Sequence, residues 1–474
     1  MHINIPDGAS AIIERLNDNG YEAYIVVGCV RDSILGKKPS DWDICTSASA
    51  ETIMEMFSDH KLFTLGIKYG TVTVFKVDDT YEVSTFRSSE DFLKQNIPDN
   101  IGISEGLYMD LALRDFTINA MAYDAHKETI IDPFAGLKDL EREMIRCVGN
   151  DVKRLNEDPL RILRALRFAS ELGFEIEDET ALAVHKNAAE LLKPSPKRIT
   201  VEMSKLLLGK NCTRILCDYS DVIATILPEL APCIGFNQNN PYHCYDVYEH
   251  IAHAVGIYTP VWNSLLTDED AEKVRKNDLV IKYALLFHDI GKPMCYTEDE
   301  KGGHFYGHPE FSTQLTKETL KHLRLREDMR RDIIQLVEIH DVSIPPTKKA
   351  IRKWISKIGK TQFERYLNLH RADVLAHSEL ALETSWGKYE QFYKLYEEII
   401  AENSCMSISK LAVNGKDLIG IGMKQGKEIG EMLNALLDAV INEEVPNSRE
   451  QLLAFALDIR SNAAAVTREE NKNV

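Results

Sequence analysis

Two aspartates that lie one residue apart give the chain its strongest chemical signal. Alternate residues of a β-strand project from the same face, so the carboxylates of Asp41 and Asp43 are expected to point together. Adjacent anions repel unless cations neutralise them, and a pair of Mg²⁺ ions meets that need. Gly28 and Arg31 stand just upstream in a Gly-x-x-Arg-Asp stretch, and a glycine turn before a helix is typical of a phosphate site. These residues predict metal-assisted nucleotidyl transfer from a bound triphosphate.

Short strands and helices must position these groups. Residues 24–27 form an apolar run that predicts a buried strand, and residues 70–77 and 80–86 are rich in β-branched and aromatic types, which predicts neighbouring strands. Residues 88–106 are polar and contain glycine and proline, so a loop is expected there. Glu82 either offers the metals a third carboxylate or pairs with a nearby base, and the sequence leaves both open.

An arginine and an aspartate stand side by side after this loop. Arg114 and Asp115 precede an apolar stretch, and together they can hold a phosphate and a ribose. Taken alone, such a pair is more often an ion pair at a helix start. Its interpretation therefore depends on the motifs around it.

An arginine-rich helix is predicted from about residue 158. Asp158 suits its N-cap, and the proline that follows suits its first turn. Arg161, Arg164 and Arg167 recur every three residues, so they share much of one helix face. Asp158 accepts hydrogen bonds and Arg161 donates them, so the two can read the Watson–Crick edge of a nucleobase in place of a template. Arg164 and Arg167 could clamp phosphates.

The composition limits the class of protein. A chain of 474 residues with 44% hydrophobic residues predicts about two to four globular domains. We see no apolar stretch long enough for a bilayer and no signal peptide, and nine scattered cysteines without a C-x-x-C spacing favour reduced thiols in the cytoplasm. The net charge of −18 argues against nonspecific coating of nucleic acid, but allows a local basic groove. The oligomeric state is not indicated.

Helical periodicity replaces the strand signal after about residue 137. The predicted fold class is therefore α+β: a small nucleotidyltransferase-type α/β head followed by an elongated all-helical neck, body and tail. We divide the chain into a catalytic head (1–136), a neck for nucleobase selection (137–232), a histidine-rich metal-binding domain (233–385) and a helical tail (386–474).

Imidazoles and carboxylates gather in the third of these segments. Side chains of this kind arriving from several helices make a metal site of mixed nitrogen and oxygen ligands. The order His, His-Asp, His, His, Asp resembles the HD phosphohydrolase domain. That resemblance implies a site for a divalent transition metal or Mg²⁺. Its core ligands would be His250, His288, Asp289 and Asp373, and His308 and His340 would be possible ligands of a second metal. His243 and His253 fit no ligand role.

The motifs of the first half, in their order, resemble class II tRNA nucleotidyltransferases, the bacterial family of CCA-adding enzymes and poly(A) polymerases. Residues 132–136 resemble the hinge motif of that family, residues 157–161 its nucleobase-reading motif and residues 198–202 its neck motif. Residues 414–419 and 426–430 resemble the tail of CCA-adding members, which implies that the tail (386–474) binds tRNA.

The resemblance implies a role for each matching residue. Asp41 and Asp43 would hold the Mg²⁺ ions, and Gly28 and Arg31 would bind the triphosphate. Arg114 with Asp115 would favour a ribonucleotide, while Asp158 with Arg161 would choose CTP or ATP. Two departures stand out, because Cys29 replaces the second glycine of the head motif and Leu113 replaces an arginine before Arg114. The cysteine is tolerable if its φ is negative.

Three functions remain open. The first is template-independent addition of C, C and A to the 3′ end of tRNA from CTP and ATP. The second is a partial reaction: addition of A alone, as in an A-adding enzyme or a poly(A) polymerase, or addition of the two C residues alone. Such partial enzymes would differ from a full CCA-adding enzyme in the loop at 88–106. The third is a metal-dependent HD phosphohydrolase acting on RNA ends, with the head reduced to RNA binding.

Overall fold

The computed structural model describes residues 2–76, 79–88, 103–262, 271–300, 302–402 and 404–470, with side chains to residue 461. The chain divides into two compact units, an N-terminal unit (Met1–Ala231) and a C-terminal unit (Pro232–Val474). Each is described by itself. None of the helices in the described ranges has the length and apolar character needed to cross a membrane.

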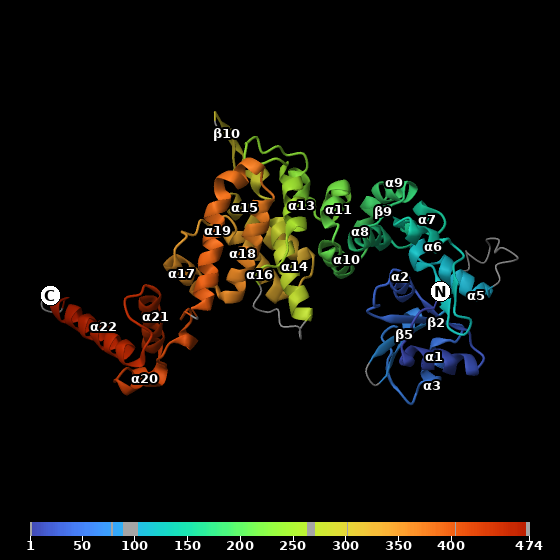
Figure 1. The fold of residues 1–474 in the computed structure, drawn as a ribbon, viewed down its shortest axis with the longest axis horizontal. Helices are drawn as coiled ribbons and strands as arrows, with labels where there is room; N and C mark the ends of the chain where they lie inside the picture. Colours follow the sequence, from blue (N-terminus) through green and yellow to red (C-terminus); the bar gives the residue numbers. More distant parts are fainter. Residues whose placement is uncertain are drawn as a thin grey trace. The chain divides into compact units, whose positions relative to one another are not determined.

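A seven-stranded sheet forms the head of the N-terminal unit (Figure 1). Its spatial order is β3-β4-β5-β2-β1-β6-β7, and only the β2–β5 pair is parallel. The strands are β1 (Ala23–Val26), β2 (Trp42–Thr46), β3 (Lys61–Phe63), β4 (Thr71–Phe75), β5 (Thr80–Thr85), β6 (Ala122–Asp124) and β7 (Thr129–Ile131). The strands predicted at 24–27, 70–77 and 80–86 are thus confirmed.

The two faces of this sheet differ in polarity. Along β2 the buried Trp42 and Ile44 alternate with Asp43, and along β5 the buried Val83 follows the exposed Glu82. Helices α1 (Asp7–Asp18) and α3 (Ala50–Met56) contact these strands. Helix α5 (Glu105–Ala112) packs with Cys45, on the Asp43 face of β2. The part of this face that carries Asp43 and Glu82 is therefore available for a functional site.

Further helices complete the N-terminal unit. They are α2 (Gly28–Ile34), α6 (Gly136–Glu141), α7 (Asp151–Glu157), α8 (Leu160–Leu172), α9 (Asp178–Lys186), α10 (Pro196–Leu208), α11 (Cys212–Asp218) and α12 (Ser220–Ile226), with short 3₁₀ turns η1 (Ile67–Tyr69), η2 (Thr117–Asn119) and η3 (Ala188–Leu192). Another 3₁₀ turn, η4 (Pro228–Cys233), follows α12. Helices α8 and α10 pack together. The arginine-rich helix begins at Leu160 with Pro159 at its N-cap, one residue later than predicted.

The C-terminal unit is mostly helical. Its helices are α13 (Val247–Ile257), α14 (Ala271–Phe287), α15 (His308–His322), α16 (Glu327–Ile339), α17 (Lys348–Ile358), α18 (Lys360–Leu375), α19 (Glu379–Ala401), α20 (Gly415–Gly420), α21 (Lys427–Ile441) and α22 (Arg449–Glu470), with 3₁₀ turns η5 (Lys292–Met294) and η6 (Ile408–Lys410). The α+β class is confirmed. The expectation of no strands after residue 137 is wrong in detail, because β8 (Met144–Ile145) pairs with β9 (Glu175–Ile176) and β10 (Thr297–Asp299) with β11 (Gly302–His304). Strands this short carry no readable periodicity.

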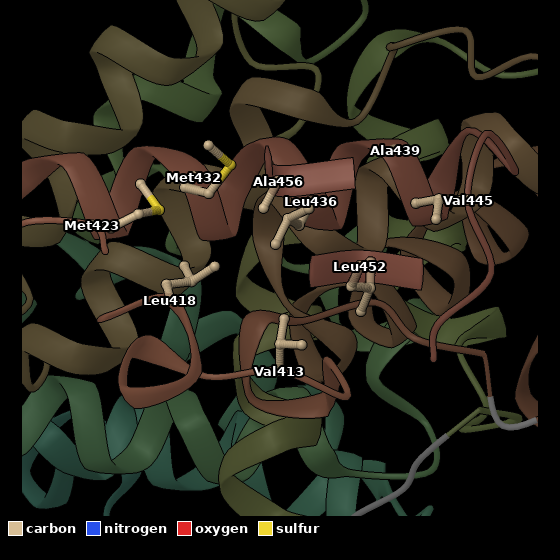
Figure 2. Packing of buried hydrophobic residues seen from close by; sticks show 9 residues of the cluster. All are labelled: Val413, Leu418, Met423, Met432, Leu436, Ala439, Val445, Leu452 and Ala456. Atoms are coloured by element: carbon tan, nitrogen blue, oxygen red, sulfur yellow. The ribbon is translucent and has the colours of Figure 1, made fainter. Parts of the chain in front are cut away.

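The last helices share a small hydrophobic core of their own (Figure 2). Its fully buried centre includes Leu418 from α20, Leu436 from α21 and Leu452 from α22, and methionines at 423 and 432 fill the space between them. The buried members of this tail core all lie between residues 413 and 456.

Candidate active site and histidine cluster

A cavity of about 820 Å³ opens on the polar face of the sheet in the N-terminal unit. Its lining combines carboxylates of the strands, polar residues of the turn after α5, and basic residues of α8 and α10. The sequence-predicted residues that line it are Asp43, Arg114, Asp115, Asp158, Arg161 and Arg164. This volume is ample for a nucleotide.

Two carboxylates line the sheet end of this cavity, while Asp41 is exposed just before β2 and is not among the lining residues. Asp43 and Glu82 are directly opposite each other in the parallel β2–β5 ladder, and both line the cavity. Glu82 forms no ion pair among the described residues, which favours the third-carboxylate interpretation over pairing with a base. The pKa of Asp43 is raised to about 7, first by burial and then by the negative charges of Asp41 and Glu82. A divalent cation would relieve this repulsion, so the residues fit one.

The turn between β1 and α2 differs from its predicted form. The left-handed residue is Val27, with φ of 68°, which is a rare conformation for a β-branched residue, and it lines the cavity. Gly28 begins the helix, and neither it nor Cys29 has positive φ, so the glycine-to-cysteine departure carries no backbone strain. Arg31 is buried and donates to Asp32 and Asn119. The structure therefore places Arg31 behind the cavity wall.

Arg114 reaches the cavity on a support that the sequence did not reveal. Its guanidinium is buried and donates from Nη2 to Oδ2 of Asp110 at 2.6 Å, one helical turn earlier. Burial disfavours the charged form, but the adjacent Asp110 outweighs it and keeps the pKa of Arg114 raised. Asp110 also accepts from the backbone N–H of Arg87, so one buried carboxylate holds β5 and α5 together. The sequence signal that could have revealed this ion pair is the spacing of four residues between Asp110 and Arg114.

Asp115 is fixed by the backbone N–H of Phe116, which donates to its Oδ1 at 2.9 Å, and by two side chains. Asn119 Nδ2 donates to its Oδ1 at 3.2 Å and Arg164 Nε donates to its Oδ2 at 2.7 Å. Burial alone would raise the pKa of this carboxyl, but Arg164 and these hydrogen bonds lower it to about 2. Asp115 is therefore a charged acceptor at neutral pH. Arg164, predicted as a phosphate clamp, is in this structure already engaged.

Asp158 and Arg161 both line the cavity, and the backbone N–H of Arg161 donates to the carbonyl of Asp158 at 2.9 Å, but their side chains bind other partners. Asp158 accepts from Arg198 of α10 at 2.7 Å through Oδ2, and its Oδ1 accepts from the backbone of Leu160. Arg161 donates to Glu157 and to backbone carbonyls, including that of Leu113 at 3.0 Å. The candidate base-reading set is therefore larger than predicted, because Arg198 belongs to it.

Arg167 is not brought to the cavity. Its side chain is buried, its Nη1 donates to Oε2 of Glu202 at 2.8 Å, and its guanidinium lies 3.9 Å from the centroid of the Phe168 ring. Spacing by three residues over two turns rotates it away from Arg161. Its contacts connect α8 with α10, and nothing in this arrangement supports the predicted phosphate clamp.

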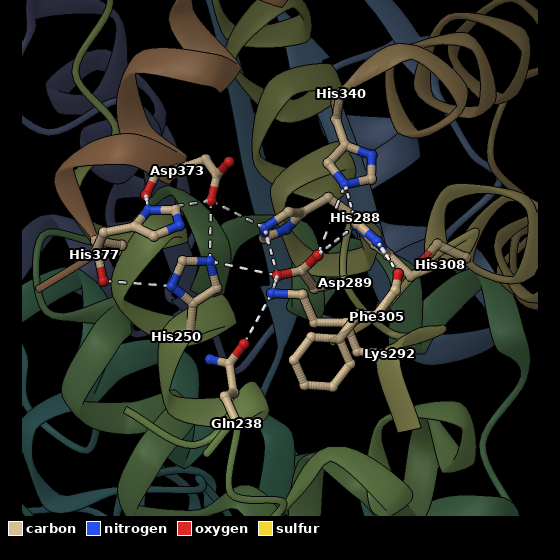
Figure 3. Close-up of polar contacts among 12 residues, drawn as sticks. Gln238, His250, His288, Asp289, Lys292, Phe305, His308, His340, Asp373 and His377 are labelled. Carbon is tan, nitrogen blue, oxygen red and sulfur yellow. Dashed lines mark hydrogen bonds and ion pairs between the residues drawn. The ribbon is translucent and has the colours of Figure 1, made fainter. Parts of the chain in front are cut away.

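In the C-terminal unit the six predicted histidines and aspartates come together (Figure 3). His250 Nε2 lies 2.9 Å from Asp373 Oδ1 and 3.4 Å from Asp289 Oδ2, and His288 Nε2 lies 3.2 Å from Asp289 Oδ2. Beside them, His308 Nε2 and His340 Nε2 are 3.0 Å apart. The residues come from α13, α15, α18 and the ends of α14 and α16.

The orientation of these rings identifies the atoms that face inward. In His250, His288, His308 and His340 the Nδ1 atom lies 2.7–3.3 Å from a backbone carbonyl, to which it can only donate. In the neutral ring Nε2 is then an acceptor without a proton. The Nε2 atoms of these histidines thus face carboxylate oxygens, and those of His308 and His340 face each other at 3.0 Å. His288 Nε2 is buried without a hydrogen-bond partner. Such a donor set fits divalent cations.

Two groups at this cluster were missed from the sequence. Lys292 Nζ lies 2.7 Å from Asp289 Oδ2 and supplies positive charge there. His377, next to Asp373 in space, belongs to a possible metal-holding group with His250. Without a metal, Asp289 and Asp373 outweigh the effect of burial and raise the pKa of His288 to about 10, so these carboxylates draw positive charge to the cluster, either a proton or a cation in its place. His253 stacks on Tyr245 instead, in keeping with the absence of a predicted ligand role.

Three family models match the chain. Residues 23–146 match a poly A polymerase head domain, residues 173–234 a probable RNA and SrmB-binding site of polymerase A, and residues 310–456 a putative tRNA nucleotidyltransferase domain 2. The first contains Asp41, Asp43 and Glu82, and the last spans α16 to α21.

Named relatives cover nearly the whole chain. It is 31% identical to a CCA-adding enzyme of Geobacillus stearothermophilus over 98% of both chains. Among solved structures, a Bacillus stearothermophilus CCA-adding enzyme in complex with CTP is 29% identical, with a TM-score of 0.65 over 99% of this chain and 100% of that one. A Thermotoga maritima CCA-adding enzyme complexed with tRNA has the same fold, with 22% identity and a TM-score of 0.57 over 95% and 94%.

Proposed function

Because the chain belongs to the family of CCA-adding enzymes, we propose that it adds C, C and A to the 3′ end of tRNA from CTP and ATP. It is a tRNA nucleotidyltransferase. The observation that carries this assignment is a single cavity that holds a repelling carboxylate set and a base-reading set on different elements. We place the reaction in the cytoplasm, where its thiols stay reduced.

The carboxylates prepare the transfer step. Asp41, Asp43 and Glu82 hold the divalent cations, for which we propose Mg²⁺. A cation held there would neutralise triphosphate charge and make the 3′-hydroxyl easier to deprotonate. The side chains themselves fix where that hydroxyl and the α-phosphate meet, because β2 and β5 hold Asp43 and Glu82 in register. Arg114 contributes positive charge at the same end of the cavity.

Selection of the nucleotide falls to the helical wall. Asp158 offers acceptor oxygens, while Arg161 and Arg198 offer donors, which suits the mixed edges of cytosine and adenine. Asp115 remains ionised and accepts the ribose hydroxyl, which favours ribonucleotides. The sequence-predicted triphosphate contacts of Gly28 remain part of this proposal, through the backbone at the start of α2.

The length of the product tests the function. We would incubate tRNA that ends at its discriminator base with CTP alone, ATP alone and both. Two added residues with CTP and three with both are expected for CCA addition. Addition of A alone, or a stop after two residues with both nucleotides present, would instead identify one of the partial enzymes.

A second candidate function rests on the histidine cluster. Acceptor nitrogens that face each other at 3.0 Å, beside the buried Asp289, fit a pair of divalent cations, either transition metals or Mg²⁺. We propose an HD-type phosphohydrolase activity on RNA ends, with the 2′,3′-cyclic phosphate as substrate. A metal here would provide hydroxide near neutral pH, and Lys292 would balance the charge of the phosphate.

A further inference from the structure

One aromatic side chain at the rim of the active-site cavity has no part in the roles above. Tyr69 lines the cavity and is 87% exposed, the highest value among the large hydrophobic side chains of the described residues. Within those residues it makes no ring stacking, ion pair or side-chain hydrogen bond. Single exposed apolar residues are common on proteins. The place of this one, beside reacting groups, calls for a reason.

The backbone under Tyr69 is held firmly although its ring is free. Tyr69 N donates to Gly66 O at 2.8 Å and closes the turn η1. Gly70 follows in the left-handed conformation, with φ of 74°, and its carbonyl accepts from Thr85 N at 2.9 Å. The ring is thus mounted on a turn pinned to β5. A tyrosine has few rotatable bonds, so ordering it against a partner costs little entropy.

The distance from Tyr69 to the carboxylates suits one nucleotide. In the β4–β5 ladder Thr73 lies opposite Glu82 and Thr71 opposite Ser84. The start of β4 is therefore two residues, roughly 7 Å, from the carboxylate row, and the turn with Tyr69 comes directly before it. A terminal nucleotide whose 3′-hydroxyl meets the carboxylates can extend its base over this interval.

Asp158, Arg161 and Arg198 on and beside α8 and α10 are already proposed to recognise the incoming base. The base that still lacks a protein contact is the one at the 3′ end of the tRNA. That base changes during the reaction, from the discriminator to the first C and then the second. Hydrogen bonds tuned to one base would fail at the next step, whereas stacking on an aromatic ring accepts every base. We propose that Tyr69 is the platform on which the 3′-terminal base of the tRNA stacks before each addition.

Steady-state kinetics test this inference, which rests on the proposed function. Tyr69→Ala should raise the KM for tRNA about ten-fold or more, with the KM for CTP within two-fold of that of the unchanged protein. Tyr69→Phe should behave like the unchanged protein, because the ring is kept. Leu65→Ala is the matched control, since Leu65 is 78% exposed in the same hairpin but does not line the cavity.

A fluorescent base provides a readout that a structural role would not move. With 2-aminopurine at the 3′ end of the tRNA, binding to the unchanged protein without nucleotide should quench its fluorescence, and Tyr69→Ala should abolish the quenching. Equal quenching in both proteins, or a kinetic effect on the KM for CTP alone, would overturn the inference. Absence of any incorporation by the unchanged protein would instead reject the proposed function.

Discussion

Arg164 of α8 donates its Nε hydrogen to Oδ2 of Asp115 at 2.7 Å, and this contact joins the arginine-rich helix to the turn after α5. The pKa of Asp115 falls to about 2 as a result, despite the burial that opposes it. The residue proposed to recognise the ribose is therefore oriented by the helix that carries the base-reading Arg161. Helix α8 therefore positions both the residue proposed to select the sugar and the residue proposed to select the base.

Replacing Asp115 with Ala should reduce the preference for CTP over dCTP by about ten-fold or more, because a hydrogen bond between the ribose and a charged acceptor is lost. Arg164→Met should lower the same preference less, since the carboxylate remains but loses its alignment. The ratio of kcat/KM for the two nucleotides is the measurement. Arg142→Met, at an exposed position of the same unit, is the control. An unchanged ratio in Asp115→Ala would rule out the ribose contact.

Asp43→Asn should stabilise the metal-free protein in a pH-dependent way. The pKa of Asp43 is raised from 3.8 to about 7, so below about pH 4 the group is protonated in both the folded and unfolded chain and the substitution changes little. Between pH 4 and 7 the unfolded chain releases this proton while the folded chain retains it, so the gain in free energy of unfolding from the substitution should grow and reach a plateau above about pH 7. Urea denaturation in EDTA from pH 4 to 8 measures it.

Asp59→Asn is the control for that series, because hydrogen bonds from Arg15 and His60 lower the pKa of this surface carboxyl to about 2. It should show no gain at any pH. A gain in Asp43→Asn that stays constant between pH 4 and 8 would contradict the carboxylate repulsion. Nucleotide incorporation by Asp43→Asn should be lost at every pH.

Arg167→Met should lower the free energy of unfolding by about 3–5 kcal/mol, because it leaves Glu202 as a buried carboxylate without its closest cation. Its KM for CTP should change less than two-fold. Arg198→Met should behave in the opposite way, with little loss of stability at this half-exposed position and impaired discrimination between CTP and ATP. A raised KM for CTP in a stable Arg167→Met protein would restore the phosphate-clamp interpretation.

His288→Ala and Asp289→Ala should each lose bound metal and hydrolysis of 2′,3′-cyclic phosphate, while CCA addition continues. Elemental analysis of the purified protein gives the metal content. His322→Ala, an exposed histidine on α15, should retain both properties. Unchanged hydrolysis in the two variants would refute the second candidate function.

Much of the fold follows from local patterns. Alternation in β2, β4 and β5 predicts both the strands and the face that carries the carboxylates, since one register slip would bury Asp43. The clustered histidines at 250, 288, 308 and 340 could be singled out from the sequence because each stands in the first turn of a helix or directly after one. The fold class is confirmed, whereas the four-segment division of the chain and the ligand roles stay predictions. Residues 89–102, within the loop where partial enzymes would differ, lie outside the described residues.

The errors share one physical origin. Spacing places Arg161, Arg164 and Arg167 along a helix, but only tertiary packing decides which of them meets Asp115, Glu202 or the cavity. The partners Asp110, Arg198 and Lys292 are likewise set by folding, because each belongs to an ion pair or hydrogen bond that no local pattern specifies. The left-handed conformation of Val27 was not predicted, because β-branched residues normally avoid positive φ.

The tail core closes over side chains that all come from one short stretch at the end of the chain. Because this segment buries its own leucines, its helices are expected to open and re-form together. We therefore expect its amide protons to exchange with solvent as one cooperative group.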